Sequence, residues 1–268
     1  MLDLSTDYLA IILIIIILWE YFFPREFILN IRKRWFNNFS LYAINIIIKW
    51  VLTFLISFTA IHIFPITDPY NFRSFLSRYL NQAEYLFLSF LLFDVFFYSL
   101  HRLFHHYQYL WRLHLVHHSD IELDVTTNFR HHPFEQLVTS WLIALFIWLG
   151  QFSIEAVSIY GVSATLIQIW HHGNISIPKN IEKMLGYLII TPSIHELHHS
   201  SCREETDSNY GAFFSIWDRI FNSFTKPNIE GKHIKITYGL EYFREQQQTL
   251  WQTLKQPFNY SNDKNTPS

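Results

Sequence analysis

Residues 94–118 read DVFFYSLHRLFHHYQYLWRLHLVHH, and they place a run of histidines directly after an apolar segment. Asp94, His101 and His105 recur at helical spacing, so they share one stripe of a helix. Adjacent turns therefore bring His101 and His105 to the same metal ion. Asp94 lies deeper in the apolar segment, where an ionisable group is costly. We therefore expect it to support catalysis by accepting a hydrogen bond from a ligand imidazole.

Two further strings, HLVHH and HELHH, repeat one histidine pattern. Spacing of i, i+3 and i+4 puts three histidines on one helical face, whereas adjacent ones diverge by about 100°. His117 and His118 can therefore face different ions, and two HxxHH strings with one HxxxH predict at least two metals. The two triplets are His114, His117 and His118, then His195, His198 and His199. The strings NFRHHPFE and WHHGNI add His131 or His132 and His171 or His172 as candidates.

The composition indicates a membrane protein. Half of the 268 residues are hydrophobic, and 16% are charged, against about 25% in soluble domains. The net charge of −2 gives no basic field for nucleic acid, so we expect no nucleic-acid partner. The single cysteine, Cys202, excludes an internal disulfide framework and a zinc site built from several thiolates.

Apolar segments long enough to approach the ~20 residues of a membrane helix recur along the chain. We interpret the first three as membrane spans and the last two as a helical hairpin, for which buried core helices are the alternative. In the second segment, Lys49 is expected to extend toward the membrane surface. The segments are residues 8–23, 41–64, 83–100, 135–150 and 154–170. The sequence thus predicts an all-α integral membrane protein with four to five transmembrane helices.

Basic residues set the expected orientation. Arg25 and the run Arg32 to Arg34 lie between the first two segments, and such loops face the cytoplasm. Alternating spans then bring every histidine string to that side. We expect a cytoplasmic, histidine-rich helical cap that holds a dimetal site. The last residues show no KDEL-like signal, which favours a bacterial inner membrane over the endoplasmic reticulum as the alternative.

The predicted organisation has three parts. Residues 1–82 form an N-terminal transmembrane region with two spans, residues 83–224 the catalytic domain, and residues 225–268 a cytoplasmic tail. Its last stretch, residues 256–268, is polar and proline-punctuated, so we expect it to be disordered.

The residues alone leave other functions open. HELHH is formally an HExxH string with Glu196, which is typical of metal-dependent hydrolases. A histidine-rich metal transporter would place its ligands near the membrane midplane, whereas these lie at helix ends. Imidazole suits zinc, copper, iron and nickel, so the ligand type does not identify the metal.

Taken together, HRLFH, HLVHH and HELHH, with HPFE and HHGNI between them, resemble a known family. They are similar to the fatty acid hydroxylase/sterol desaturase superfamily of integral-membrane di-iron enzymes. TPSIHELHH and NYGAFFSIWDRIF extend the resemblance, which covers about residues 85–224.

The resemblance implies a set of metal ligands. His106, His131 and His171 fall outside the family pattern, and His62 and His233 are expected at the surface. The implied ligands are His101, His105, His114, His117, His118, His132, His172, His195, His198 and His199.

The resemblance also implies an activity. Two iron ions would activate the co-substrate O₂, and the enzyme would hydroxylate or desaturate an unactivated C–H bond of a membrane lipid, such as a sterol or fatty acyl chain. Zinc can replace iron in purified protein. The sequence shows neither a haem domain nor a glycine-rich dinucleotide motif, so electrons are expected from a separate cytochrome b5, ferredoxin or reductase. The lipid itself stays open.

Overall fold

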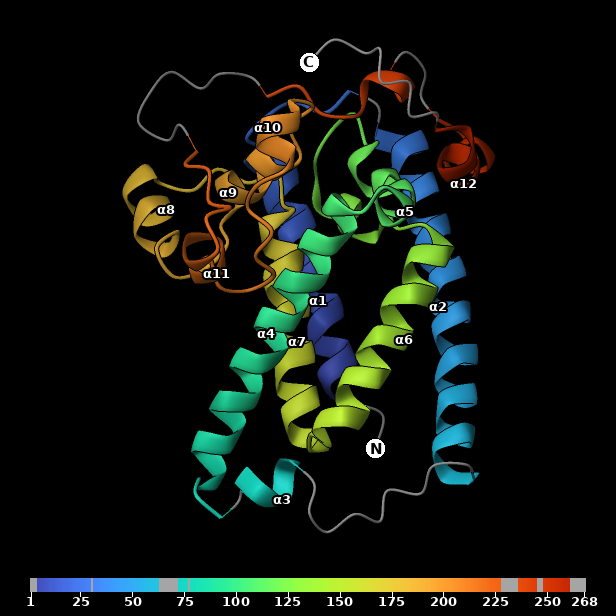
Figure 1. Cartoon of the computed structure of the whole chain (residues 1–268). Helices are drawn as coiled ribbons and strands as arrows, with labels where there is room; N and C mark the ends of the chain where they lie inside the picture. The colour runs from blue at the N-terminus through green and yellow to red at the C-terminus, as the bar shows by residue number, and fades with distance from the viewer. Residues whose placement is uncertain are drawn as a thin grey trace.

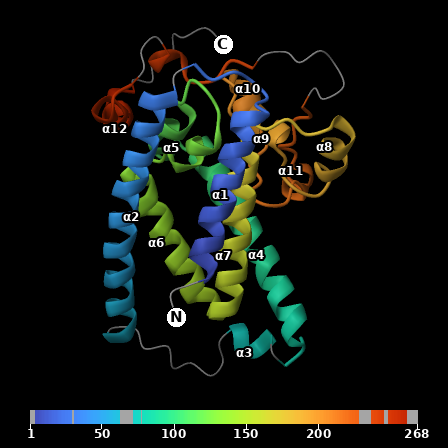
Figure 2. The same ribbon diagram turned by 180° about the vertical axis from the view of Figure 1, so that it is seen from behind.

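The computed structural model describes residues 4–29, 31–62, 72–76, 78–227, 236–244 and 248–260. All regular elements within them are helices, which confirms the predicted all-α class. Five long helices run side by side in Figures 1 and 2. They are α1 (Leu4–Phe22), α2 (Ile31–His62), α4 (Gln82–His106), α6 (Pro133–Gly150) and α7 (Ile154–His171).

Shorter helices gather mainly at the upper end of this bundle in Figure 1, except α3 at the opposite end. The short helices are α3 (Phe72–Leu76), α5 (Gln108–His118), η1 (Val125–Phe129), α8 (Lys179–Leu185), α9 (Pro192–His198), α10 (Arg203–Thr206), α11 (Ile216–Ile220), η2 (Glu241–Phe243) and α12 (Leu250–Asn259).

Three described segments are long and apolar enough to cross a membrane: Ile31–Leu55, Gln82–His106 and Pro133–Gly150. Ala10–Phe22 is a shorter apolar helix. The chain is therefore a membrane protein, while the predicted total of four to five spans stays a prediction. The boundaries predicted at residues 82 and 224 also stay predictions, since α1 and α2 pack in the same bundle as α6 and α7.

The predicted hairpin between α6 and α7 is confirmed, and local sequence explains its turn. Gln151 ends α6 in the left-handed conformation, with φ of 47°. Ser153 then begins α7, because its hydroxyl accepts a hydrogen bond from the Ala156 backbone N–H. Phe93 of α4 stacks on Tyr160 of α7, with ring centroids 5.4 Å apart. These contacts hold the hairpin against α4.

The predicted loop between the first two spans is shorter than expected. Helix α2 begins at Ile31, well before residue 41, so it includes Arg34. Arg34 is buried, and its guanidinium pairs with Asp120 at 3.3 Å and with Asp124. Helix α2 extends this far because these carboxylates neutralise its buried cation.

We predicted disorder from residue 256 onward, and this prediction is wrong for residues 256–259. Those residues complete α12, and the buried Gln256 side chain accepts a hydrogen bond from the Ser119 hydroxyl at 2.9 Å. Leu254 packs against the buried cluster that includes Trp111 and Leu115, so α12 is held against α5. Residues 261–268 and His233 lie outside the described residues, as do residue 77 and residues 63–71, which include the end of the predicted second span.

Candidate metal centre

Every multi-histidine string lies at the same end of the bundle (Figure 1). The end of α4 supplies the first string and α5 the second, while α7 and α9 supply the last two. Two groups of imidazole nitrogens result, each with its nitrogens within 4.8 Å of one another. Group A contains His101, His105, His114, His118 and His198, and group B contains His117, His172, His195 and His199.

Adjacent histidines do separate between the groups, as helical geometry predicts. In α5, His118 belongs to group A and His117 to group B. In HELHH, His198 belongs to group A while His195 and His199 belong to group B. Both HxxHH strings therefore contribute to both groups, which places the two groups next to each other.

In group A, two ring nitrogens that carry lone pairs lie close to each other. His101 gives its Nδ1 proton to the Tyr210 carbonyl at 3.0 Å, and His114 gives its Nδ1 proton to Glu135 at 2.8 Å. Both Nε2 atoms consequently carry lone pairs, and they lie 3.2 Å apart. Two lone pairs at this distance repel unless a cation lies between them.

Group B has the same arrangement. His172 donates from Nδ1 to the Gln168 carbonyl at 2.8 Å, so its Nε2 carries a lone pair. That atom lies 3.3 Å from Nε2 of His117 and 2.9 Å from Nε2 of His195. Imidazole nitrogens about 2.0–2.1 Å from one metal ion lie roughly 3.0–3.4 Å apart. The nitrogens of group B therefore fit a shared ion.

Several buried ring nitrogens in group A have no hydrogen-bond partner within the described residues. They are Nε2 of His105, Nε2 of His198 and both nitrogens of His118. Burial lowers the pKa of His118 well below its usual value and that of His198 to about 3, so both rings are neutral. Neutral, buried and unpartnered imidazoles are the donors that a metal ion requires.

Glu135 is a candidate functional residue that sequence reasoning missed. Its Oε1 accepts hydrogen bonds from Nδ1 of His114 at 2.8 Å and from Nδ1 of His131 at 3.0 Å. With these two histidines it forms a third group of potential ligands. The i, i+4 spacing of His131 and Glu135 was the available signal.

The prediction for Asp94 is wrong. Among the described residues, its carboxylate accepts no hydrogen bond from an imidazole. Oδ1 accepts from the Tyr160 hydroxyl and the Phe213 backbone N–H, both at 3.0 Å. Oδ2 accepts from the Phe214 N–H at 3.0 Å and the Trp217 indole at 2.7 Å. Asp94 thus anchors the segment before α11 to α4, and that segment carries the carbonyl that orients His101.

His132 does not join either group. Its Nδ1 accepts from the Phe134 backbone N–H at 3.1 Å and begins α6, and its Nε2 donates to the Leu254 carbonyl at 3.2 Å. With both nitrogens engaged, it has no lone pair for a metal, so we remove it from the proposed ligands. His131 instead stacks on His117, with centroids 4.5 Å apart. His171 stacks on His195 at 3.9 Å, while His106 is exposed.

Glu196 forms its ion pair and its hydrogen bond with residues outside the two groups. Its carboxylate pairs with the Arg25 guanidinium and accepts a hydrogen bond from the Tyr238 hydroxyl. In a hydrolase, the glutamate of HExxH would act as general base beside the metal. The geometry therefore disfavours the hydrolase alternative.

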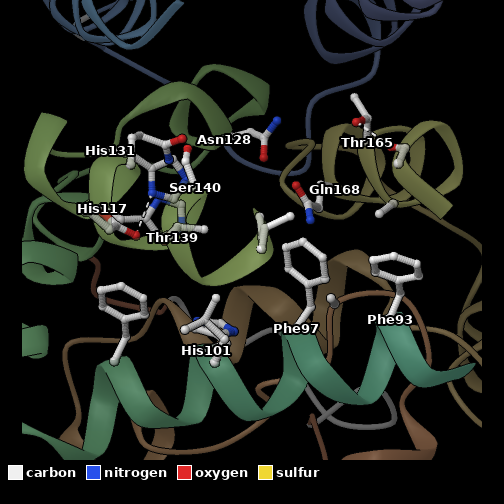
Figure 3. Close-up of a pocket in the computed structure, with 18 of the residues that line it drawn as sticks. Phe93, Phe97, His101, His117, Asn128, His131, Thr139, Ser140, Thr165 and Gln168 are labelled. Atoms are coloured by element: carbon white, nitrogen blue, oxygen red, sulfur yellow. Dashed lines mark hydrogen bonds and ion pairs between the residues drawn. The ribbon is translucent and has the colours of Figure 1, made fainter. Parts of the chain in front are cut away.

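A cavity of about 450 Å³ begins at the histidines and extends between α4, α6 and α7. This volume lies within the ~300–1,000 Å³ typical of small-molecule sites. Figure 3 shows His101, Phe97 and Phe93 of α4 on one wall, with His117 and His131 across from them. Members of both histidine groups therefore line the same cavity.

Comparisons with known proteins agree with this arrangement. A model of the family described as fatty acid hydroxylase matches residues 86–223. The alkylglycerol monooxygenase of Homo sapiens is 32% identical over 161 residues, covering 58% of this chain and 32% of that protein.

Two other relatives carry different names. The ornithine lipid hydroxylase OlsE of Rhizobium tropici is 30% identical over 130 residues, which cover 48% of this chain and 38% of that protein. The very-long-chain aldehyde decarbonylase GL1-6 of Oryza sativa subsp. indica is 31% identical over 142 residues, covering 50% and 22%. No solved structure matches the chain significantly.

This chain spans about a third of the length of the alkylglycerol monooxygenases that it matches. The matched residues nevertheless run from α4 to the end of α11, so they include every helix that supplies a member of the two groups. Because the family model covers just over half of the chain, the chain belongs to the fatty acid hydroxylase family.

Proposed function

We propose that this protein is an O₂-dependent, non-haem di-iron oxidoreductase that hydroxylates an unactivated C–H bond of a membrane lipid. One observation carries the proposal: two adjacent groups of imidazoles line one end of a cavity that continues between apolar helices. The named activities of two relatives, alkylglycerol monooxygenase and ornithine lipid hydroxylase, support the same chemistry.

Groups A and B would each hold one iron ion, and the bound irons would supply the reductive activation of O₂. The reaction consumes the lipid, O₂, two electrons and two protons, and it yields the lipid alcohol and water. The electrons would come from a separate cytochrome b5, ferredoxin or reductase. Zinc can replace iron at the same nitrogens in purified protein, because imidazole accepts both metals.

The chain's own residues position the ligands and exclude water. Glu135 and the carbonyls of Tyr210 and Gln168 orient imidazole rings through their Nδ1 protons. Such partners raise the basicity of a ligand and fix its tautomer. The buried Leu100 and Phe104 cover the cavity beside His101, which keeps bulk water from the reacting carbon.

We infer that the histidine end faces the cytoplasm of a bacterial inner membrane. Arg25, Arg32 and Lys33 lie at that end of the bundle, and this asymmetry supports the orientation.

The experiment is oxygen labelling with purified, iron-loaded protein, a reductant and a mixture of cellular lipids under ¹⁸O₂. We expect lipid alcohols that carry one ¹⁸O atom, and none with the His195→Ala variant. Lipid cleavage without O₂ would contradict the proposal and favour hydrolysis. Loss of two hydrogens without label would identify desaturation instead of hydroxylation.

A further inference from the structure

The side chain of Lys49 lines the cavity, although it belongs to a segment of α2 that is long and apolar enough to cross a membrane. Its expected extension toward the membrane surface stays a prediction; the side chain is exposed and also reaches the cavity. In the described part of the chain, its ammonium group has no hydrogen bond and no ion pair. A cation within a membrane is costly and is normally paired.

Lys49 lies close to the level of the histidines along the axis of α2. One turn earlier on α2, the Asn45 side chain donates a hydrogen bond to the His131 carbonyl at 2.9 Å. Lys49 is therefore about one helical turn, ~5.4 Å, beyond the level of His131. A molecule that contacts Lys49 would have the metal groups beside it.

The protein supplies a counter-charge only from a distance, because the Glu135 carboxylate attracts the Lys49 ammonium without forming an ion pair with it. Among the described residues that line the cavity, Lys49 is the only lysine or arginine, and Glu135 is the only carboxylate. Glu135 accepts hydrogen bonds from His114 and His131, and it forms no ion pair with Lys49. A ligand in the cavity is therefore the available source of a counter-charge in direct contact with Lys49.

The cavity changes from polar to apolar along α6. Gln136, Thr139 and Ser140 line it in the first two turns, near the histidines, and Ile143 and Ile147 line it further along. A ligand that matches these walls has a polar head beside the histidines and an apolar tail beyond.

The cavity walls formed by α4 and α7 show the same change from polar to apolar residues. Figure 3 shows Phe97 and Phe93 of α4 extending away from His101 along the cavity. On α7, Gln168 lies nearest the histidines. The Thr165 hydroxyl is occupied by the Gly161 carbonyl at 2.8 Å. The apolar end of the cavity is therefore formed by three helices.

We propose that the cavity binds an amphiphilic lipid with its head toward the histidines, and that Lys49 pairs with a carboxylate or phosphate on that head. The inference rests on the proposed hydroxylation, and it places the oxidised carbon close to the head rather than at the middle or end of the chain. The proposed substrate class is therefore an amphiphilic lipid with one acidic head group.

The test compares three lipids of equal chain length: palmitate, hexadecyl phosphate and neutral hexadecylglycerol. Iron-loaded wild-type protein, Lys49→Met and Lys49→Arg are assayed, with Lys179→Met on the exposed face of α8 as the matched control. Losing a charged hydrogen bond should raise KM for an acidic lipid by roughly 10- to 100-fold in Lys49→Met. Lys49→Arg and Lys179→Met should keep the wild-type preference.

The two acidic lipids identify the source of the charge, since a selective effect on palmitate indicates a carboxylate and one on hexadecyl phosphate a phosphate. Mass spectrometry of the products should place the hydroxyl within the first few carbons. An equal change for all three lipids, or oxidation at the chain end, would overturn the inference.

Binding measured on zinc-loaded protein separates this inference from the proposed function. Displacement of a fluorescent fatty acid should require more of the acidic lipids in Lys49→Met than in wild type. If that holds while iron-loaded protein oxidises no lipid, the proposed hydroxylation fails and the Lys49 site stands. If lipids are hydroxylated but Lys49→Met changes neither binding nor KM, the proposed function stands and the Lys49 site fails.

Discussion

Nε2 of His101 and Nε2 of His114 face each other at 3.2 Å, although each ring has already given its only proton to an oxygen. The fold therefore holds two electron pairs in a contact that only a cation can stabilise. The same relationship between His172 and its neighbours in group B predicts a second cation.

We expect purified protein to contain two metal ions per chain. His195→Ala removes a ligand of group B and should lower the content to about one ion, as measured by plasma mass spectrometry. His132→Asn is the control, because asparagine also begins helices well and His132 lies outside both groups. A fully active protein with one ion, or metal loss in His132→Asn, would contradict the proposed pair of sites.

Glu135→Gln should lower metal affinity or turnover by roughly 10- to 100-fold, because such partners of ligand histidines have effects of that size. The amide keeps the volume but donates as well as accepts, so it cannot serve both His114 and His131 equally. Glu155→Gln, an exposed carboxylate at the start of α7, is the matched control. Unchanged metal retention in Glu135→Gln would show that this carboxylate is dispensable.

Asp94→Asn and Asp94→Leu should both destabilise the protein. Four donors converge on this buried carboxylate, and hydrogen bonds to charged groups contribute about 1.5–3 kcal/mol each. Leucine should lower the Tm more than asparagine, since it leaves every donor unsatisfied. Glu204→Gln on the exposed part of α10 should leave the Tm unchanged. A raised Tm in Asp94→Leu would refute the anchoring role.

Metal-stripped protein should lose stability as the pH falls below about 6.5. Burial lowers the pKa of His198 to about 3 in the folded state, whereas an unfolded histidine titrates near 6.5. Between these values only the unfolded state binds the proton, which costs up to about 1.4 kcal/mol per pH unit for each such residue. Thermal unfolding at pH 7.5 and 5.5 measures the slope, and His198→Gln should make it shallower. A flat profile would contradict the burial of neutral rings.

Labelling of single cysteines tests the orientation. In a Cys202→Ser background, cysteines at Tyr109 and Tyr79 are both accessible, since the native side chains are 80% and 72% exposed. Tyr109 belongs to α5 at the histidine end, and Tyr79 lies near α3 at the opposite end (Figure 1). We expect an impermeant reagent to label them from opposite sides, with Tyr109→Cys reached from the cytoplasm. Labelling of both from one side would exclude the proposed topology.

Helical periodicity predicted the parts of the site that lie within helices. The separation of His117 from His118 followed from the angle between adjacent residues, and the structure places them in different groups. The hairpin at residues 151–153 was predictable because a polar interruption divides two apolar runs.

Periodicity could not choose between His131 and His132, because both precede α6 and lie outside any helix. His132 begins α6 through its Nδ1, while His131 bonds to Glu135 one turn into the helix. The error for Asp94 had another cause. Its partners, Phe213, Phe214 and Trp217, are more than a hundred residues away in the chain. No local pattern predicts contacts of that kind.

The carbonyls of Ser208 and Tyr210 orient His198 and His101, although the ribosome adds these two residues after all five long helices. A chain that ends before residue 208 has its apolar helices but no complete set of oriented ligands. We therefore expect metal loading to be a late step of biogenesis that follows insertion of the long helices. The metal content of this protein in cells should then measure how many chains have been completed and folded, rather than how many have reached the membrane.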